Sequence, residues 1–233
     1  MTGIIAHVLK STLADLPWIE RFGGLVSVAT RPEIIQAIDG VSSFKAMQTY
    51  PVACGVNLEN CWEGNKFKHF EPDSSKAAIA FFYDTSGLKL KSTDGPRNSR
   101  LTFAFNLKFL CWLNIKRLGE DITANGCMPS GRLVPFVWAK MYGEHSAVGL
   151  FGGGIEETML QNIEVTEVDE IAKNPNMFEP FSFAKNGDKR GLFIYPYDYF
   201  GLNIRGQFTI NRLCLPVDFG VDWEPTTNEC TTP

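Results

Sequence analysis

The chain has 233 residues, 44% hydrophobic and 12% aromatic, which is enough apolar material for a packed core and argues against disorder of the whole. Its 22 basic and 26 acidic residues give a net charge of −4, so it lacks the basic surface that nucleic-acid backbones select. No apolar run approaches 18 residues and Lys10 follows the first one, so we expect neither a membrane span nor a secretory signal.

The N-terminal region is predicted to be helical. Apolar residues recur at spacings of three and four from Ile4 to Phe22, as in an amphipathic helix. Pro17 would end or restart this helix, and Gly23-Gly24 would close its second piece. A short helix is expected after Pro32, because proline suits a first helical turn.

Two short strands and a long connection are predicted next. Tyr50–Leu58 is rich in β-forming residues, and Ala77–Tyr83 is a compact apolar run of strand length. Asp84–Arg100 is rich in turn residues and almost free of large apolar ones, which predicts a long exposed loop. Connections of this length often contact something else.

The clearest pattern of the chain is the alternation from Leu101 to Lys116. Every odd position is apolar, and most even positions are polar or small. A period of two predicts a strand with one buried face. Sixteen residues at about 3.3 Å each would make it unusually long, on the order of 50 Å, so we interpret it as a scaffold element.

The C-terminal half is predicted to contain a helix and further strands. Leu133–Tyr142 favours a helix, Ile155–Ile171 fits either a strand or a helix, and Asn174–Phe183 indicates a turn with a short helix. Leu192–Tyr195 is strand-like, and Tyr197–Phe200 is interpreted as a tight aromatic turn.

Alternation then resumes from Leu202 to Ile210 and changes phase at Arg212, as one inserted residue at a bulge would cause. From these elements we predict one α+β domain over residues 1–217, followed by a polar C-terminal tail over 218–233. We expect a mainly antiparallel sheet with one unusually long strand, helices packed on one face, and an exposed loop at 84–100.

Candidate catalytic and metal sites are weak. His145 beside Ser146 lacks the Gly-x-Ser-x-Gly elbow of one hydrolase class, which favours a surface turn. Cys54, Cys61 and His69 miss the spacing of two to four residues by which paired thiolates hold zinc. We therefore favour core and loop cysteines over a metal site.

The remaining candidates also have structural explanations that we favour. Gly152–Gly154 lacks the rest of a phosphate-binding motif and suits a hinge, His7 suits a helix boundary, and Tyr195–Phe200 suits a corner of the core. A run of acids suits a solvated face: Glu164, Glu167, Asp169 and Glu170. We predict no catalytic residue, no metal and no cofactor.

The six cysteines form no disulfide framework, because they are too sparse for one. They are Cys54, Cys61, Cys111, Cys127, Cys214 and Cys230. Cys111 and Cys214 lie in strand patterns, where cysteine is usually a small buried hydrophobe. We expect reduced thiols and a reducing compartment.

The order of elements resembles the tail-terminator and neck-ring proteins of tailed bacteriophages. Four stretches carry this resemblance: Leu16-Pro17-Trp18, the strand from Pro51, the strand from Ser99 to Asn114, and the closing Tyr195–Ile210. The last two look similar to ring or tail-completion proteins of crAss-like phages. In such proteins helices pack on one face of a mainly antiparallel sheet, and loops join the subunits into a ring.

The resemblance implies a non-catalytic virion protein that forms a homo-oligomeric ring at the head–tail junction, as a neck ring or tail terminator. Its partners would be copies of itself and neighbouring portal, neck or tail proteins, without membrane or specific nucleic-acid binding, although DNA would pass through the ring. It would assemble in the host cytoplasm and reside in the virion. Two alternatives stay open, a ligand- or carbohydrate-binding module using the aromatic turn at 195–200 and a hydrolase with a dispersed site.

Overall fold

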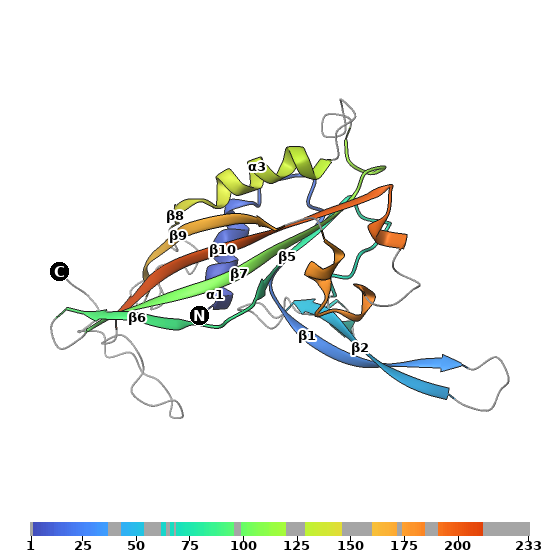
Figure 1. The fold of residues 1–233 in the computed structure, drawn as a ribbon, viewed down its shortest axis with the longest axis horizontal. Helices are drawn as coiled ribbons and strands as arrows, with labels where there is room; N and C mark the ends of the chain where they lie inside the picture. Colours follow the sequence, from blue (N-terminus) through green and yellow to red (C-terminus); the bar gives the residue numbers. More distant parts are fainter. Residues whose placement is uncertain are drawn as a thin grey trace.

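The protein is seen in a computed structural model that describes residues 2–36, 43–53, 62–63, 66–67, 69–95, 99–119, 129–145, 160–171, 174–184 and 191–211. In this part of the chain, eight strands form one sheet with two α-helices on one face (Figure 1). The helices are α1 (Thr2–Thr12) and α3 (Pro129–Met141). The sheet contains β1 (Arg21–Gln36), β2 (Ser43–Ala53), β5 (Ala78–Asp84), β6 (Lys89–Asp94), β7 (Arg100–Asn114), β8 (Gly143–His145), β9 (Leu160–Ile171) and β10 (Tyr197–Asn211).

The sheet is antiparallel except at one pair. Its strand order is β2-β1-β5-β7-β10-β9-β8, and β6 pairs with β7 beyond the end of β5. Only β1 and β5 run parallel. Two very short strands, β3 (Trp62–Glu63) and β4 (Lys66–Phe67), form a separate pair. The predicted α+β class with a mainly antiparallel sheet is confirmed.

Three strands of similar length dominate the sheet. β7 and β10 have 15 residues each and pair along their whole length, while β1 has 16. β7 is long, but it is not the one unusually long strand that was expected, because β1 and β10 match it in length. The predicted tail at 218–233 and the predicted bulge at Arg212 lie outside the described residues.

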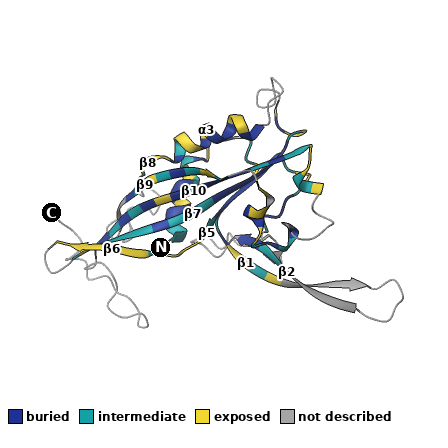
Figure 2. Cartoon of the chain, viewed as in Figure 1, coloured by how far each residue is buried: buried dark blue, intermediate teal, exposed yellow. Residues whose placement is uncertain are grey.

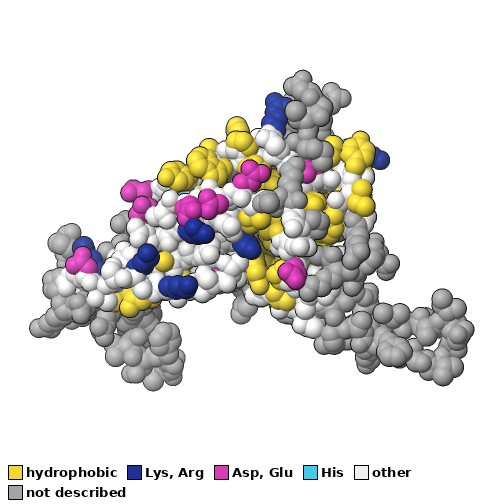
Figure 3. Space-filling model, in the orientation of Figure 1, with side chains coloured by type: hydrophobic (Ala, Val, Ile, Leu, Met, Phe, Trp, Pro, Cys, Tyr) yellow, Lys and Arg dark blue, Asp and Glu magenta, His cyan; other side chains and the backbone are white. Residues whose placement is uncertain are grey.

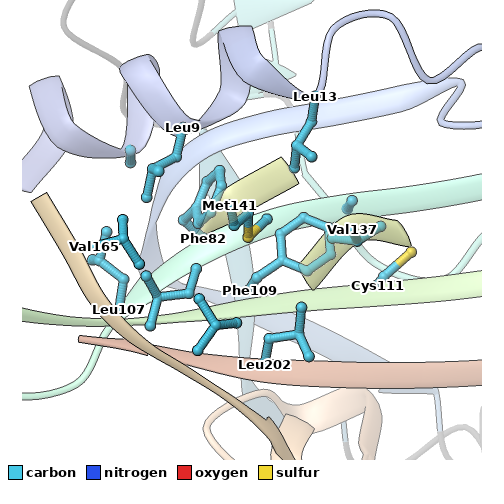
Figure 4. Close-up of a cluster of buried hydrophobic side chains, with 14 of the residues drawn as sticks. Leu9, Leu13, Phe82, Leu107, Phe109, Cys111, Val137, Met141, Val165 and Leu202 are labelled. Carbon is cyan, nitrogen blue, oxygen red and sulfur yellow. The ribbon is translucent and has the colours of Figure 1, made fainter. Parts of the chain in front are cut away.

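The main core lies between the sheet and the two helices. Phe105, Leu107, Phe109, Cys111 and Leu113 of β7 are at most 3% exposed, as the alternation predicted. Figure 4 shows residues of α1 and α3 closing over this row, among them Leu9, Leu13, Val137 and Met141. The helices therefore pack on one face, and Figure 2 shows buried residues along the strands and on α3.

A buried carboxylate connects β10 to the start of α3. Asp198 is 3% exposed, and its Oδ2 accepts a hydrogen bond of 2.8 Å from the backbone N–H of Ser130. Its Oδ1 accepts another, of 2.9 Å, from the N–H of Tyr199. The side chain thus caps a helix N-terminus, where free N–H groups and the helix dipole favour a negative charge.

An aromatic layer covers part of the opposite face. It consists of η3 (Pro175–Phe178), η4 (Ser182–Ala184) and the segment 191–195, and its rings pack over Leu110 and Trp112 of β7. The Trp112 indole N–H donates a hydrogen bond of 2.6 Å to the carbonyl of Leu192, and the indole stacks on Tyr197 at 5.1 Å. This layer forms a second, smaller core.

The N-terminal predictions were partly wrong. The helix ends at Thr12, where Ser11 and Thr12 hydroxyls donate to backbone carbonyls of the preceding turn, and residues 21–36 form β1. Gly23 therefore lies in a strand, where an added Cβ would come within 3.0–3.1 Å of Phe70 and Phe81. The helix expected after Pro32 is also strand, because this stretch pairs with β2.

Further along, one helix prediction is confirmed, one ambiguous segment is resolved as strand, and three predictions are corrected. α3 covers the predicted helix at 133–142, and β9 shows that the ambiguous segment before Ile171 is strand from Leu160. The loop predicted at 84–100 contains β6, which forms because it pairs with β7. Residues 192–195 are a short helical turn, and the aromatic turn predicted at 197–200 is the start of β10.

Candidate assembly interface

Of the weak zinc candidates Cys54, Cys61 and His69, the structure describes only His69. His69 forms an isolated bridge with Val52, and its Nδ1 lies 3.5 Å from the buried carboxylate of Glu71. Cys54 and Cys61 lie outside the described residues. No group of three or more potential metal ligands occurs within the described ranges.

Of the other candidate residues, some lie at structural positions in helices and strands, and the rest lie outside the described residues. His145 lies on β8 with its Nε2 at 2.9 Å from the carbonyl of Met141, and His7 is exposed on α1. Ser146 and Gly152–Gly154 fall outside the described part of the chain. Cys111 is a free, fully buried thiol, as predicted, and burial raises its pKa well above the ordinary value.

Most of the aromatic segment at 195–200 is part of the core. Tyr197 stacks on Trp112, Tyr199 contacts Phe178 edge-on, and Phe200 is fully buried. Only Tyr195 has a largely exposed ring, at 73%. A sugar-binding platform needs several accessible rings, so this segment offers less stacking surface than its sequence indicates.

A two-stranded arm projects from the body of the protein. We call residues 27–36 of β1 and 43–52 of β2 the β1–β2 arm. β1 pairs with β5 only as far as Val26, whereas its register with β2 continues to Gln36 opposite Ser43. Figure 1 shows the arm leaving the sheet at one end of the long axis of the molecule. Ten residues at about 3.3 Å each give it a reach of roughly 33 Å.

The base of the arm is held against the aromatic layer. The Thr49 N–H donates a hydrogen bond of 2.7 Å to the Ser182 hydroxyl, and the Thr49 hydroxyl lies 3.0 Å from the carbonyl of Pro180. Thr30, the register partner of Thr49 on β1, is exposed. Within the described residues, no strand other than β2 pairs with β1 beyond Val26.

At the other end of the molecule, β6 is an exposed edge strand. All six of its residues, Lys89–Asp94, are exposed, including Leu90 at 56%. It pairs with β7 on one side, and the described residues place no strand on its outer side. Edge lysines such as Lys89 and Lys91 oppose uncontrolled pairing with other chains.

The edge of the sheet formed by β8 and β9 is acidic. Glu164, Glu167 and Asp169 lie on the face away from the helices, where Glu167 pairs with Arg205 at 2.6 Å and Glu164 accepts from Gln207 at 2.8 Å. A hydrogen bond shared with Glu167 raises the pKa of Asp169 above its ordinary value, and the same bond lowers the pKa of Glu167. Figure 3 shows acidic and basic side chains over this open face.

Helix α3 closes the far part of this edge. The indole N–H of Trp138 donates to the carbonyl of Val168 on β9, and the indole stacks on Tyr142 with ring centres 5.2 Å apart. Phe136 of the same helix is also exposed, at 61%. None of the helices in the described residues is long and apolar enough to cross a membrane.

Comparison with models of protein families, with curated proteins and with solved structures finds no match to this chain. The features that the geometry offers for function are therefore the arm, the exposed β6 edge and the acidic edge formed by β8 and β9. Sequence reasoning predicted a contact segment in the region of β6 and a strand from Tyr50, which overlaps the end of β2. It missed the rest of the arm, because those stretches carry no period-two apolar pattern.

Proposed function

We propose that this protein is a structural subunit of a tailed-phage virion, which assembles into a homo-oligomeric ring at the head–tail junction as a neck ring or tail terminator and performs no catalysis. The β1–β2 arm carries this proposal. Portal, neck or tail proteins would be its neighbours, and DNA would pass through the ring.

The length of the paired arm supports a role in contacts between chains. A two-stranded hairpin without further cover is marginally stable in water. Beyond Thr30 and Thr49, however, β1 and β2 keep their register for six more residue pairs, from Arg31 opposite Gln48 to Gln36 opposite Ser43. A neighbouring subunit that packs against the arm would bury apolar surface and stabilise it.

The use of the polar side chains supports a scaffold role as well. Asp198 caps α3, Glu164 and Glu167 bond to β10, and the Trp112 indole bonds to the backbone under the aromatic layer. These groups hold strands and helices in place, which is the work expected of a subunit whose function is to keep its shape.

The experiment that tests the proposal removes the arm without disturbing its base. Residues 31–48 are replaced by Asn-Gly, because Thr30 and Thr49 are register partners and a two-residue turn of this type joins antiparallel strands. We expect the variant to unfold cooperatively, as a folded protein does, but to be a single chain in sedimentation velocity, where we expect the wild-type protein to form rings.

A matched control shortens only the tip. Replacing residues 37–42 by Asn-Gly joins Gln36 to its partner Ser43 and keeps the whole paired length of the arm. This control should assemble like the wild type, and imaging of virions with a specific antibody should locate the protein at the neck. Rings that form equally well without the arm, or absence of the protein from purified virions, would overturn the proposal.

A further inference from the structure

One row of residues crosses five strands of the sheet and ends in opposite charges. Lys89 of β6 lies opposite Ala104, which lies opposite Gln207, then Glu164, and then Glu144 of β8. Lys89 and Glu144 are thus the two ends of a single row on the same face of the sheet. At this level, β6 and β8 are the outermost described strands on the two sides.

The charges around the two ends are complementary. Near β6, exposed Lys89, Lys91 and Arg100 outnumber Asp94. At the level of β8, the opposite edge carries the carboxylates of Glu144 and Glu164.

The strand directions suit a head-to-tail arrangement. Four antiparallel pairings separate β6 from β8, so the two edge strands run in the same direction. If each copy is related to the next by the same rotation, β6 of one copy lies beside β8 of the next. The two strands then lie at the same height along the ring axis. Such heterologous contacts close into a ring when the rotation closes.

We propose that the β6 edge of one copy docks on the β8 edge of the next, with Lys89 facing Glu144. This inference rests on the proposed ring and specifies its interface. The partner is a second copy of this chain, since both complementary edges belong to one molecule. Trp138 covers β9 at Val168, so the contact is confined to the level of β8.

A charge swap tests the interface in the full-length protein. Lys89→Glu and Glu144→Lys should each weaken association about tenfold or more at low salt, because like charges then face each other. The double variant with both changes should regain most of the wild-type affinity, since each contact again joins opposite charges. Lys116→Glu, an exposed lysine beyond the end of β7, is the matched control and should have no comparable effect.

The measurements are sedimentation velocity and native mass spectrometry over a range of protein concentrations. Rings whose affinity is unchanged by both single variants would overturn this interface and leave the proposed ring function standing. Double variants that associate no better than the single ones would also overturn it. A wild-type protein that stays a single chain at every concentration and is absent from virions would overturn both proposals.

Discussion

The two faces of β7 differ in how far their cover extends. On the face toward α1 and α3, the residues from Phe105 to Leu113 are buried without interruption. On the opposite face Leu110 and Trp112 are buried under the aromatic layer, whereas Asn106 and Lys108 are only partly covered. The helix face of β7 is therefore buried from Phe105 to Leu113, whereas its other face is buried only at Leu110 and Trp112 and is an open polar surface at Asn106 and Lys108.

This difference shows what a local pattern determines and what distant segments decide. Alternation within β7 is sufficient to define the face toward the helices, because every residue on it is apolar. The extent of cover on the other face depends on η3 and η4, which are more than 60 residues away in the chain. Substitutions on the two faces should therefore differ in size.

The largest effect is expected on the helix face. Phe105→Asp should prevent folding, because an unpaired buried carboxylate costs several kcal/mol against a total stability of roughly 5 to 15 kcal/mol. Lys108→Gln, on the open part of the other face, is the control and should leave the protein folded. Circular dichroism and urea unfolding distinguish the two results, and a cooperatively folded Phe105→Asp variant would show that this face is not a core.

A smaller effect is expected under the aromatic layer. Trp112→Ala should lower the free energy of unfolding by about 3 to 5 kcal/mol, the cost usual for deleting a buried ring. Trp112→Phe keeps a ring and loses the hydrogen bond to Leu192, so it should cost less. Chemical denaturation measures both values. If the alanine variant lost under about 1 kcal/mol of unfolding free energy, the substitution would resemble an ordinary surface change. The aromatic layer would then not be a true core.

The finest test compares two glycines of β10 that face opposite sides. A Cβ at Gly206 would lie 2.2 Å from the Glu164 carbonyl oxygen and 2.4 Å from Phe105, so backbone would have to move. A Cβ at Gly201 would meet only side chains, the nearest being the sulfur of Met177 at 2.9 Å.

We expect Gly206→Ala to cost about 3 kcal/mol and Gly201→Ala about 1 kcal/mol, the two ends of the range for overpacking. Thermal unfolding of both variants under one buffer condition gives the comparison. Equal losses would indicate that the two faces yield to extra volume in the same way.

Much of the sheet could be predicted from the sequence. The buried face of β7, the run at β5, the alternation of β10 after Leu202 and the helix at 133–142 all follow from local periodicity. Local periodicity misled at the N-terminus, where apolar spacing beyond Thr12 continued the helical pattern into a turn and a strand. There the pairing with β5 and β2 outweighs local preference.

The candidate interface was less accessible to sequence reasoning. Lys-Leu-Lys-Ser-Thr-Asp at 89–94 reads as loop, and it is a strand because β7 offers it a partner. The opposition of Lys89 and Glu144 depends on the register of five strands, so no local window contains both ends. The charged residues can be read from the sequence, but the fact that Lys89 and Glu144 end one row across the sheet cannot.

The pairing of β7 with β10 has a consequence for biosynthesis. Thr102 and Thr209, whose hydroxyls lie 3.1 Å apart, are separated by 107 residues in the chain. Contacts of such long range are slow to form, and on a translating ribosome β7 emerges well before its partner exists. β5 and β6 precede β7 and can pair with one side of it, but its β10 side stays open for several seconds, at about 5 to 20 residues per second. Chaperone binding during synthesis would therefore favour a high yield of soluble subunit.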